Sequence, residues 1–397
     1  AESVDFTNMI ASMPVCAASR ASLLTGKYTT STGMVINEIR MNTSHRCLAV
    51  CLNDAGYETS YIGKWHLYAN ELGNHYDPKN SYVPPGPDRL GFDGYWAAYN
   101  FHHEYYGEAA YYHLNTPEKV FFPEGTYEPD GQTDLAIKRL REHSKQEAPF
   151  YLQLNFGPPH LPWREENVPE HWMKEFRDMD FPLPPNYSTV KDPHGDDWSN
   201  EDHDPEKIQD WKRVYYAQTS SIDENIGRLR AALSELNLDE NTIFIFTSDH
   251  GEMFGAQGRV MKNIFYEEAS RIPFLLRMPT KDDGANTAPE KIDACTSYVD
   301  VMPTLLGLIG TEIPREVEGM DVSHLIRGED GPEPEFAFLQ NTGACAAWEN
   351  GHEWRALRNK QYTYAVFKSD GQELLFDNQN DPFQTKNLAN DRDHKET

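Results

Sequence analysis

Three apolar, β-rich runs along the chain each end in a cluster of polar side chains. The runs cover residues 57–62, 150–156 and 242–246, and the clusters that follow them are Gly63-Lys64-Trp65-His66, Pro158-Pro159-His160 and Asp249-His250-Gly251-Glu252. Helical patterns lie between the runs, and the clearest places apolar residues at 222, 226, 229, 233 and 236. Strands that alternate with helices predict an α/β fold with a large, mostly parallel sheet sandwiched by helices. Ligands bind at the carboxyl ends of the strands in such a sheet, where all three clusters are expected to meet.

The chain is expected to divide into a large and a small part. The stretch RGEDGPEPEF, residues 327–336, has the composition of a hinge, and several short β-rich segments with turns follow it. We therefore predict an α/β domain over 1–331 and a small C-terminal α+β subdomain over 332–397 that contains an antiparallel sheet. Residues 158–210 are rich in Pro, Asp, Trp and His without clear periodicity, which indicates long loops over the sheet that form part of a substrate wall.

A cysteine lies where a short helix is expected to begin, in the stretch PVCAASRASLLTGKY of residues 14–28. Gly26 can close this helix because glycine tolerates the left-handed cap. Free N–H groups at the helix start attract anions and lower the pKa of a thiol at Cys16, and Arg20 lies one turn further on the same side. A nucleophile beside a fixed cation suits attack on a phosphate or sulfate ester. On this segment alone, a half-buried structural cysteine is the alternative.

Composition narrows the classes of partner. The chain has 397 residues, 39% of them hydrophobic and 12% aromatic, which indicates a packed core. Its formal net charge of −27 disfavours nucleic acid and anionic membrane surfaces as partners. No apolar run approaches the roughly 18 residues that a membrane span needs. The five cysteines show no zinc-site spacing, and Cys47 and Cys51 are expected to pack as small apolar groups.

Together these segments resemble the type I sulfatases of the alkaline phosphatase superfamily. CAASRASLLTG, which starts at Cys16, is similar to the first signature of that family, Cys-x-Pro-Ser-Arg followed by Leu-Thr-Gly, and GYETSYIGKWH, residues 56–66, fits the second at every defined position. Similar segments continue in order to about residue 390. The resemblance implies a hydrolase of sulfate esters, with a sulfated carbohydrate as its substrate, and a periplasmic or secreted location.

The resemblance also implies a role for each site residue. Cys16, converted by a formylglycine-generating maturation enzyme and then hydrated, would be the nucleophile. Arg20 and Lys64 would hold the hydrated aldehyde and the sulfate oxygens, and His66 would be the base for the elimination step. His160 and Lys262 would bind sulfate and help protonate the departing alcohol. Asp249 and His250, with position 16, would coordinate one calcium ion.

Three departures from the family pattern stand out. Ala18 occupies a position where the signature usually has Pro, and Gln257 stands where many members have His, which we interpret as substrate-side variation. Family members begin with a strand that ends in two adjacent Asp residues, and this chain is expected to start after that strand. The pairs at 196–197 and 282–283 are poor substitutes because neither follows an apolar strand.

Two other functions stay open from the sequence. The first is a phosphonate or phosphate monoester or diester hydrolase of the same superfamily, and the second is a non-catalytic glycan-binding relative. Aromatic side chains could stack on sugar rings or serve as core and loop anchors, and the candidates are Trp163, Trp198, Trp348 and Trp354.

Overall fold

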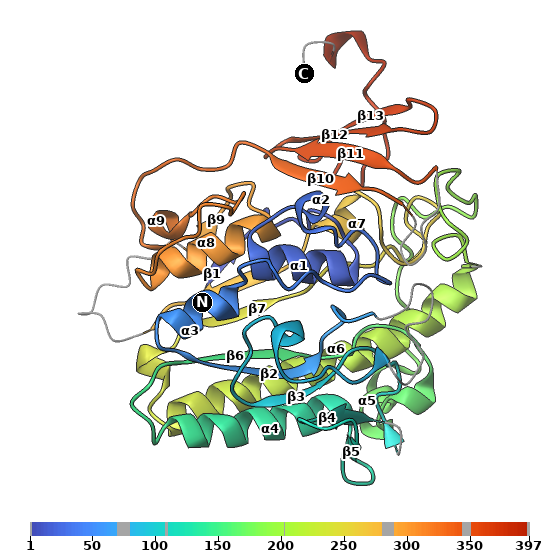
Figure 1. Ribbon diagram of the computed structural model, residues 1–397. Coiled ribbons are helices and arrows are strands. Elements are labelled where there is room, and N and C mark those ends of the chain that lie inside the picture. The colour runs from blue at the N-terminus through green and yellow to red at the C-terminus, as the bar shows by residue number, and fades with distance from the viewer. Residues whose placement is uncertain are drawn as a thin grey trace.

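The computed structural model describes residues 2–69, 80–107, 110–201, 203–279, 290–343 and 351–394. The strands within these ranges form three sheets (Figure 1). The first has the order β5-β4-β3-β2-β6, with β2 Glu58–Lys64, β3 Trp96–Tyr99, β4 Tyr111–His113, β5 Lys119–Phe121 and β6 Phe150–Asn155. The second has the order β7-β8-β1-β9, with β1 Val4–Phe6, β7 Phe244–Thr247, β8 Phe274–Arg277 and β9 Lys291–Ile292. The third is β10 Ala337–Asn341, β11 Trp354–Arg358, β12 Tyr362–Phe367 and β13 Glu373–Asp377.

Helices cover both faces of the first sheet. Helices α4, Glu128–His143, and α6, Pro205–Glu235, lie on one side of this sheet in Figure 1. Their apolar side chains pack on β2, β3 and β6. The opposite face packs against α1, Cys16–Thr25, and α3, Leu48–Asp54. The α8 helix, Tyr298–Leu308, lies against α1 and the second sheet. The shorter helices are α2 Thr29–Thr32, α5 Glu170–Phe176, α7 Glu267–Ser270 and α9 Ser323–Ile326.

Helix α6 is longer than its apolar pattern indicated. The side chain of Asp204 caps its start by accepting hydrogen bonds of 3.0 Å from the backbone N–H groups of Glu206 and Lys207, and Pro205 occupies the first turn. The helix therefore begins within the stretch expected to be loop, and the short α5 also lies there. Residues 177–201 keep the irregular backbone that the sequence predicted.

The predicted α/β class with a separate C-terminal antiparallel sheet is confirmed, but the main strands form two sheets rather than one. Among the strands of the described ranges, the parallel pairs are β2–β3, β2–β6 and β1–β9. Strands β6 and β7 are both edge strands among the described residues, and they line the same cleft of about 2020 Å³. All of their side chains are only half-buried, although most are apolar. The cleft therefore runs between two strand edges that have no partner in the described part of the chain.

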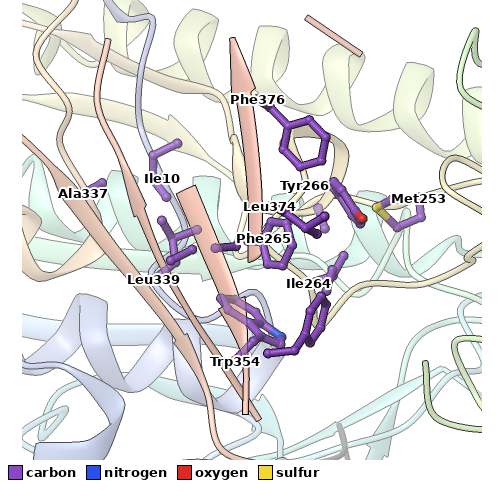
Figure 2. Packing of buried hydrophobic residues seen from close by; sticks show 14 of the residues in the cluster. Ile10, Met253, Ile264, Phe265, Tyr266, Ala337, Leu339, Trp354, Leu374 and Phe376 are labelled. Atoms are coloured by element: carbon purple, nitrogen blue, oxygen red, sulfur yellow. The ribbon is translucent and has the colours of Figure 1, made fainter. Parts of the chain in front are cut away.

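The C-terminal sheet packs on the segment that follows Lys262. Ile264 and Phe265 lie in a buried apolar cluster with Trp354, Leu374 and Phe376 of that sheet, as Figure 2 shows. The ring of Phe265 contacts Trp354 edge-on, with ring centroids 5.2 Å apart. This packing fixes the segment on which Lys262 is carried. The boundary predicted at 331–332 stays a prediction.

Other sequence expectations concern isolated residues. Cys47 and Cys51 are buried in apolar surroundings, as expected. Asp196 accepts a 2.7 Å hydrogen bond from the backbone N–H of Ser199, which is a loop-capping role. The Asp pair at 282–283, Cys345 and Trp348 lie outside the described residues. Across the described ranges, none of the helices is both long and apolar enough to cross a membrane.

Candidate active site

Cys16 lies at the first position of α1, as predicted from its sequence. Val15 is extended and precedes the helix, and Gly26 closes it in the left-handed conformation with φ of 63°. The Sγ atom of Cys16 lies 3.1 Å from Nε2 of His250. Burial alone raises the pKa of this thiol, but the positive charges of Lys262 and Lys64 outweigh burial and hold the pKa well below its ordinary value. An anion at position 16 is therefore stabilised.

The end of β2 places Lys64 and His66 close to Cys16. A Cβ atom at Gly63 would lie 2.1 Å from the carbonyl oxygen of Asn155, so only glycine allows β2 to approach β6 this closely. Both Lys64 and His66 are buried. Burial, reinforced by the charge of Lys64, lowers the pKa of His66 to about 4, while a hydrogen bond with Cys16 opposes that shift. His66 is therefore a neutral imidazole at pH 7.

Arg20 ties α1 to the ends of β2 and β7. Its Nε and Nη2 atoms donate to Oδ2 of Asp249 at 3.1 and 3.0 Å, and its Nη1 atom donates to the carbonyl oxygen of Lys64 at 2.8 Å. Burial opposes ionisation of the Asp249 carboxyl, but the charges of His250 and Arg20 prevail and hold its pKa well below the usual range. The guanidinium and the carboxylate are thus a fixed ion pair beside Cys16.

His160 and Lys262 form a second pair that interacts with the cysteine. Nδ1 of His160 lies 3.0 Å from the carbonyl oxygen of Leu161, and Nε2 lies 3.1 Å from Nζ of Lys262. A carbonyl can only accept, so Nδ1 carries the imidazole proton and Nε2 accepts from the ammonium. Burial and the charges of Lys262 and Lys64 lower the pKa of His160 to about 3. The transferable proton of this pair is therefore on Lys262.

The structure brings the predicted site residues together around position 16. Direct contacts or electrostatic interactions connect all of them: Cys16, Arg20, Lys64, His66, His160, Asp249, His250 and Lys262. Their chemical roles stay predictions. Gln257 differs from our interpretation, because its Nε2 atom donates to the backbone carbonyls of Phe383 and Gln384 at 3.2 and 2.9 Å. It anchors the C-terminal segment by these bonds rather than varying the substrate side.

Two further side chains contact the predicted site residues. No role was predicted for His103, and Trp198 was predicted only as a candidate that stacks on sugar rings or anchors the core or a loop. The ring of His103 stacks on His160, with centroids 4.5 Å apart. The ammonium of Lys262 lies over the ring of Trp198, 4.4 Å from its centroid. His103 follows the β3 strand. Because that strand is short and rich in alanine, the sequence shows no strong β pattern before His103, and no site residue was predicted there. Of the other aromatic candidates, Trp163 and Trp354 are core residues with 8% and 2% of their surface exposed.

A partial cation site also lies here. The ligand atoms of Cys16, Asp249 and His250 lie within 4.8 Å of one another. Calcium prefers six to eight oxygen ligands, whereas these residues offer one carboxylate, one imidazole and one sulfur atom. Oδ2 of Asp249 is moreover engaged by Arg20. Within the described ranges, the donors therefore fit only part of a calcium shell.

Comparison with known proteins shows similarity to sulfatases along the whole chain. The family model described as Sulfatase matches residues 1–311, and the model described as N-sulphoglucosamine sulphohydrolase, C-terminal, matches residues 255–397. An ulvan-active sulfatase of Formosa agariphila is 34% identical over 98% of this chain and 70% of its own length. An endo-4-O-sulfatase of Bacteroides thetaiotaomicron is 29% identical over 98% of this chain and 79% of its own length. A crystal structure of the sulfatase yidJ from Bacteroides fragilis superposes with a TM-score of 0.82, 29% identity and coverage of 99% and 85% of the two chains.

Proposed function

The chain belongs to the sulfatase family and is a sulfuric ester hydrolase, and we propose that the sulfate ester it cleaves is carried on a carbohydrate. The similarity to an ulvan-active sulfatase and to an endo-4-O-sulfatase supports a sulfated polysaccharide or oligosaccharide as the substrate. A phosphonate or phosphate ester would meet the same cations, so it stays the alternative to be tested.

The observation that carries this proposal is the placement of Cys16 among cations. The net charge of the chain is −27, yet the side chains that stabilise an anion at position 16 are Lys262, Lys64 and His250. A locally positive pocket in an acidic protein is what an anionic ester group needs. Because sulfur is attacked while negative charge builds on its oxygens, fixed cations around the nucleophile lower the barrier.

The family implies that position 16 carries formylglycine, whose hydrate supplies a hydroxyl that attacks sulfur. The residues around it fit this group: His66 interacts with the side chain at position 16 and is neutral at pH 7. It therefore suits accepting the proton of the second hydroxyl in the elimination step, when the bond from carbon to the sulfate oxygen breaks and the aldehyde forms again. Arg20 is held rigidly by Asp249 and by the carbonyl of Lys64. We infer that Arg20 and Lys64 orient the sulfate oxygens.

Departure of the alcohol requires a proton at the leaving oxygen. The Lys262 ammonium is bound to Nε2 of His160, while Nδ1 of His160 is bound to a carbonyl. We therefore assign the proton that reaches the leaving oxygen to Nζ of Lys262, and we assign to His160 the orientation of that ammonium. This refines the role that the resemblance gave to both residues. Asp249 and His250 would hold one side of a divalent cation, which supplies charge to polarise the sulfate when bound.

Turnover by protein produced together with a formylglycine-generating enzyme tests the proposal. We expect hydrolysis of 4-nitrophenyl sulfate and release of inorganic sulfate from sulfated oligosaccharides, both at rates well above those for a 4-nitrophenyl phosphonate monoester. Faster hydrolysis of the phosphonate would favour the alternative. Retention of sulfated glycan without any turnover, in protein whose position 16 is shown by mass spectrometry to be converted, would indicate a binding protein instead.

A further inference from the structure

The ammonium of Lys262 is held between two neutral rings. Nζ lies 4.4 Å from the centroid of the Trp198 ring and 3.1 Å from Nε2 of His160. Only 2% of the surface of Lys262 is exposed. A cation over an aromatic face is attracted by the ring quadrupole, and that attraction is greater where water is excluded. Trp198 therefore contributes to the position that the ammonium adopts.

The backbone around Trp198 is tied to the segment that carries Lys262. The carbonyl oxygen of Ser199, the next residue, accepts a 2.9 Å hydrogen bond from the backbone N–H of Val260. Asp192 and Arg259 form an ion pair of 2.8 Å whose side chains are 9% and 2% exposed. These links fix the loop of Trp198 relative to Lys262 through both backbone and side chains.

The indole also packs beside the segment that carries the nucleophile. Trp198 packs against the buried cluster of Met13, Val15 and Ala18, which flank Cys16 in the sequence. Trp198 thus contacts both the residues that flank Cys16 and the ammonium of Lys262. Trp198 lies outside the two signature segments that start at Cys16 and Gly56, in a stretch of turns.

We propose that Trp198 is a positioning residue that holds the Lys262 ammonium over the anion site beside Cys16. The proposal rests on the proposed function and deepens it, because it names what keeps the leaving-group cation in place. Lys64 and Lys262 both act on Cys16 and repel each other, so an ammonium on a flexible stem needs a partner. An aromatic face attracts the ammonium without adding a negative charge that would compete with sulfate.

Binding of inorganic sulfate tests this independently of turnover. Isothermal titration calorimetry would compare the wild-type protein with Trp198→Phe, which keeps an aromatic face, and Trp198→Leu, which does not. Trp211→Leu is the matched control, since Trp211 holds the ammonium of Lys207 at 4.7 Å. We expect Trp198→Leu to weaken sulfate binding by about fivefold to tenfold, and Trp198→Phe and the control to stay within about twofold of wild type.

The same variants are then assayed for turnover, with circular dichroism confirming that each is folded. For Trp198→Leu, we expect kcat to fall more for an alkyl sulfate than for 4-nitrophenyl sulfate, whose leaving oxygen needs less protonation. Unchanged sulfate affinity in Trp198→Leu would overturn the proposal, and a raised KM for glycan sulfate alone would show that Trp198 is a sugar platform instead. If the wild type binds sulfate but cleaves no sulfate ester, the proposed function fails, while the sulfate affinities still decide the role of Trp198.

Discussion

Replacing Arg20 by Met tests whether the ion pair with Asp249 is the rigid element of the site. The variant keeps the length of the side chain but removes both charged hydrogen bonds to Oδ2 and the bond to the carbonyl of Lys64. The Asp249 carboxylate is then left beside Cys16 without its guanidinium. The side chains of Arg20 and Asp249 are 12% and 24% exposed, so water reaches the pair only in part.

Breaking a buried pair costs about 3–5 kcal/mol, and the partial exposure of Asp249 places this pair at the lower end, about 3 kcal/mol. Unfolding entropy of about 2 cal/mol/K per residue amounts to roughly 0.8 kcal/mol/K for a chain of this size. The melting temperature of Arg20→Met should therefore fall by about 4 °C. Asp249→Asn in the Arg20→Met background should recover about half of that loss, because no unpaired carboxylate remains.

The stability that the Arg20–Asp249 pair contributes should fall as the pH is lowered. The folded-state pKa of Asp249 lies below its unfolded value, so the pair contributes its full stability above about pH 4 and loses it as the pH falls further. Thermal unfolding at pH 5 and pH 8 should give the same difference between wild type and Arg20→Met, and the difference should shrink below pH 4. Arg177→Met, which breaks an exposed bidentate pair with Glu170, is the control and should leave the melting temperature nearly unchanged. Equal shifts for Arg20→Met and Arg177→Met would refute the reasoning.

Four further outcomes follow from the geometry. Cys16→Ala should lower turnover by several orders of magnitude with little change in melting temperature, and activity within tenfold of wild type would contradict the proposed nucleophile. Lys262→Met should cost about 10²–10³ in kcat for an alkyl sulfate and clearly less for 4-nitrophenyl sulfate, as a comparison of initial rates would show. Gln257→Ala should expose the C-terminal segment to limited proteolysis while turnover is retained; an unchanged cleavage pattern would argue against the anchoring role. Hydrogen exchange measured by mass spectrometry should show that about half the backbone amides of 150–155 exchange quickly, while those of 58–64 stay protected. The reason is that a strand paired on one side only has hydrogen bonds at alternate amides. Equal protection of the two strands would mean that the second edge of β6 is covered.

The local elements of the site could be predicted because each depends on neighbouring residues. The helix that begins near Cys16 and is closed by Gly26 follows from small residues, Leu23, Leu24 and a glycine cap, and the structure has a helix over Cys16–Thr25 with Gly26 as its cap. The β2 strand was expected at 57–62 and lies at 58–64. In each case the period of apolar positions and the terminating residue carry the information, and both are visible in a single sequence.

Pairing between distant strands could not be predicted in the same way. Nothing local in 150–155 or 244–247 reveals that β6 pairs only with β2 and β7 only with β8 among the described strands, so one sheet was expected where two are present. Gln257 was misjudged for the same reason. Its partners, the carbonyls of Phe383 and Gln384, are more than 120 residues away, and the contact depends on how the C-terminal segment docks.

The charges of the site explain how an acidic chain can select a sulfate ester. Arg20, Lys64 and Lys262 act on position 16, and Asp249 compensates one of them through its ion pair with Arg20. Burial and the neighbouring lysines keep His66 and His160 neutral at pH 7, so neither imidazole adds to the positive charge. Lys64, Lys262 and His250 all stabilise negative charge at position 16. Because negative charge builds up as the ester bond breaks, these side chains stabilise the transition state more than the bound substrate.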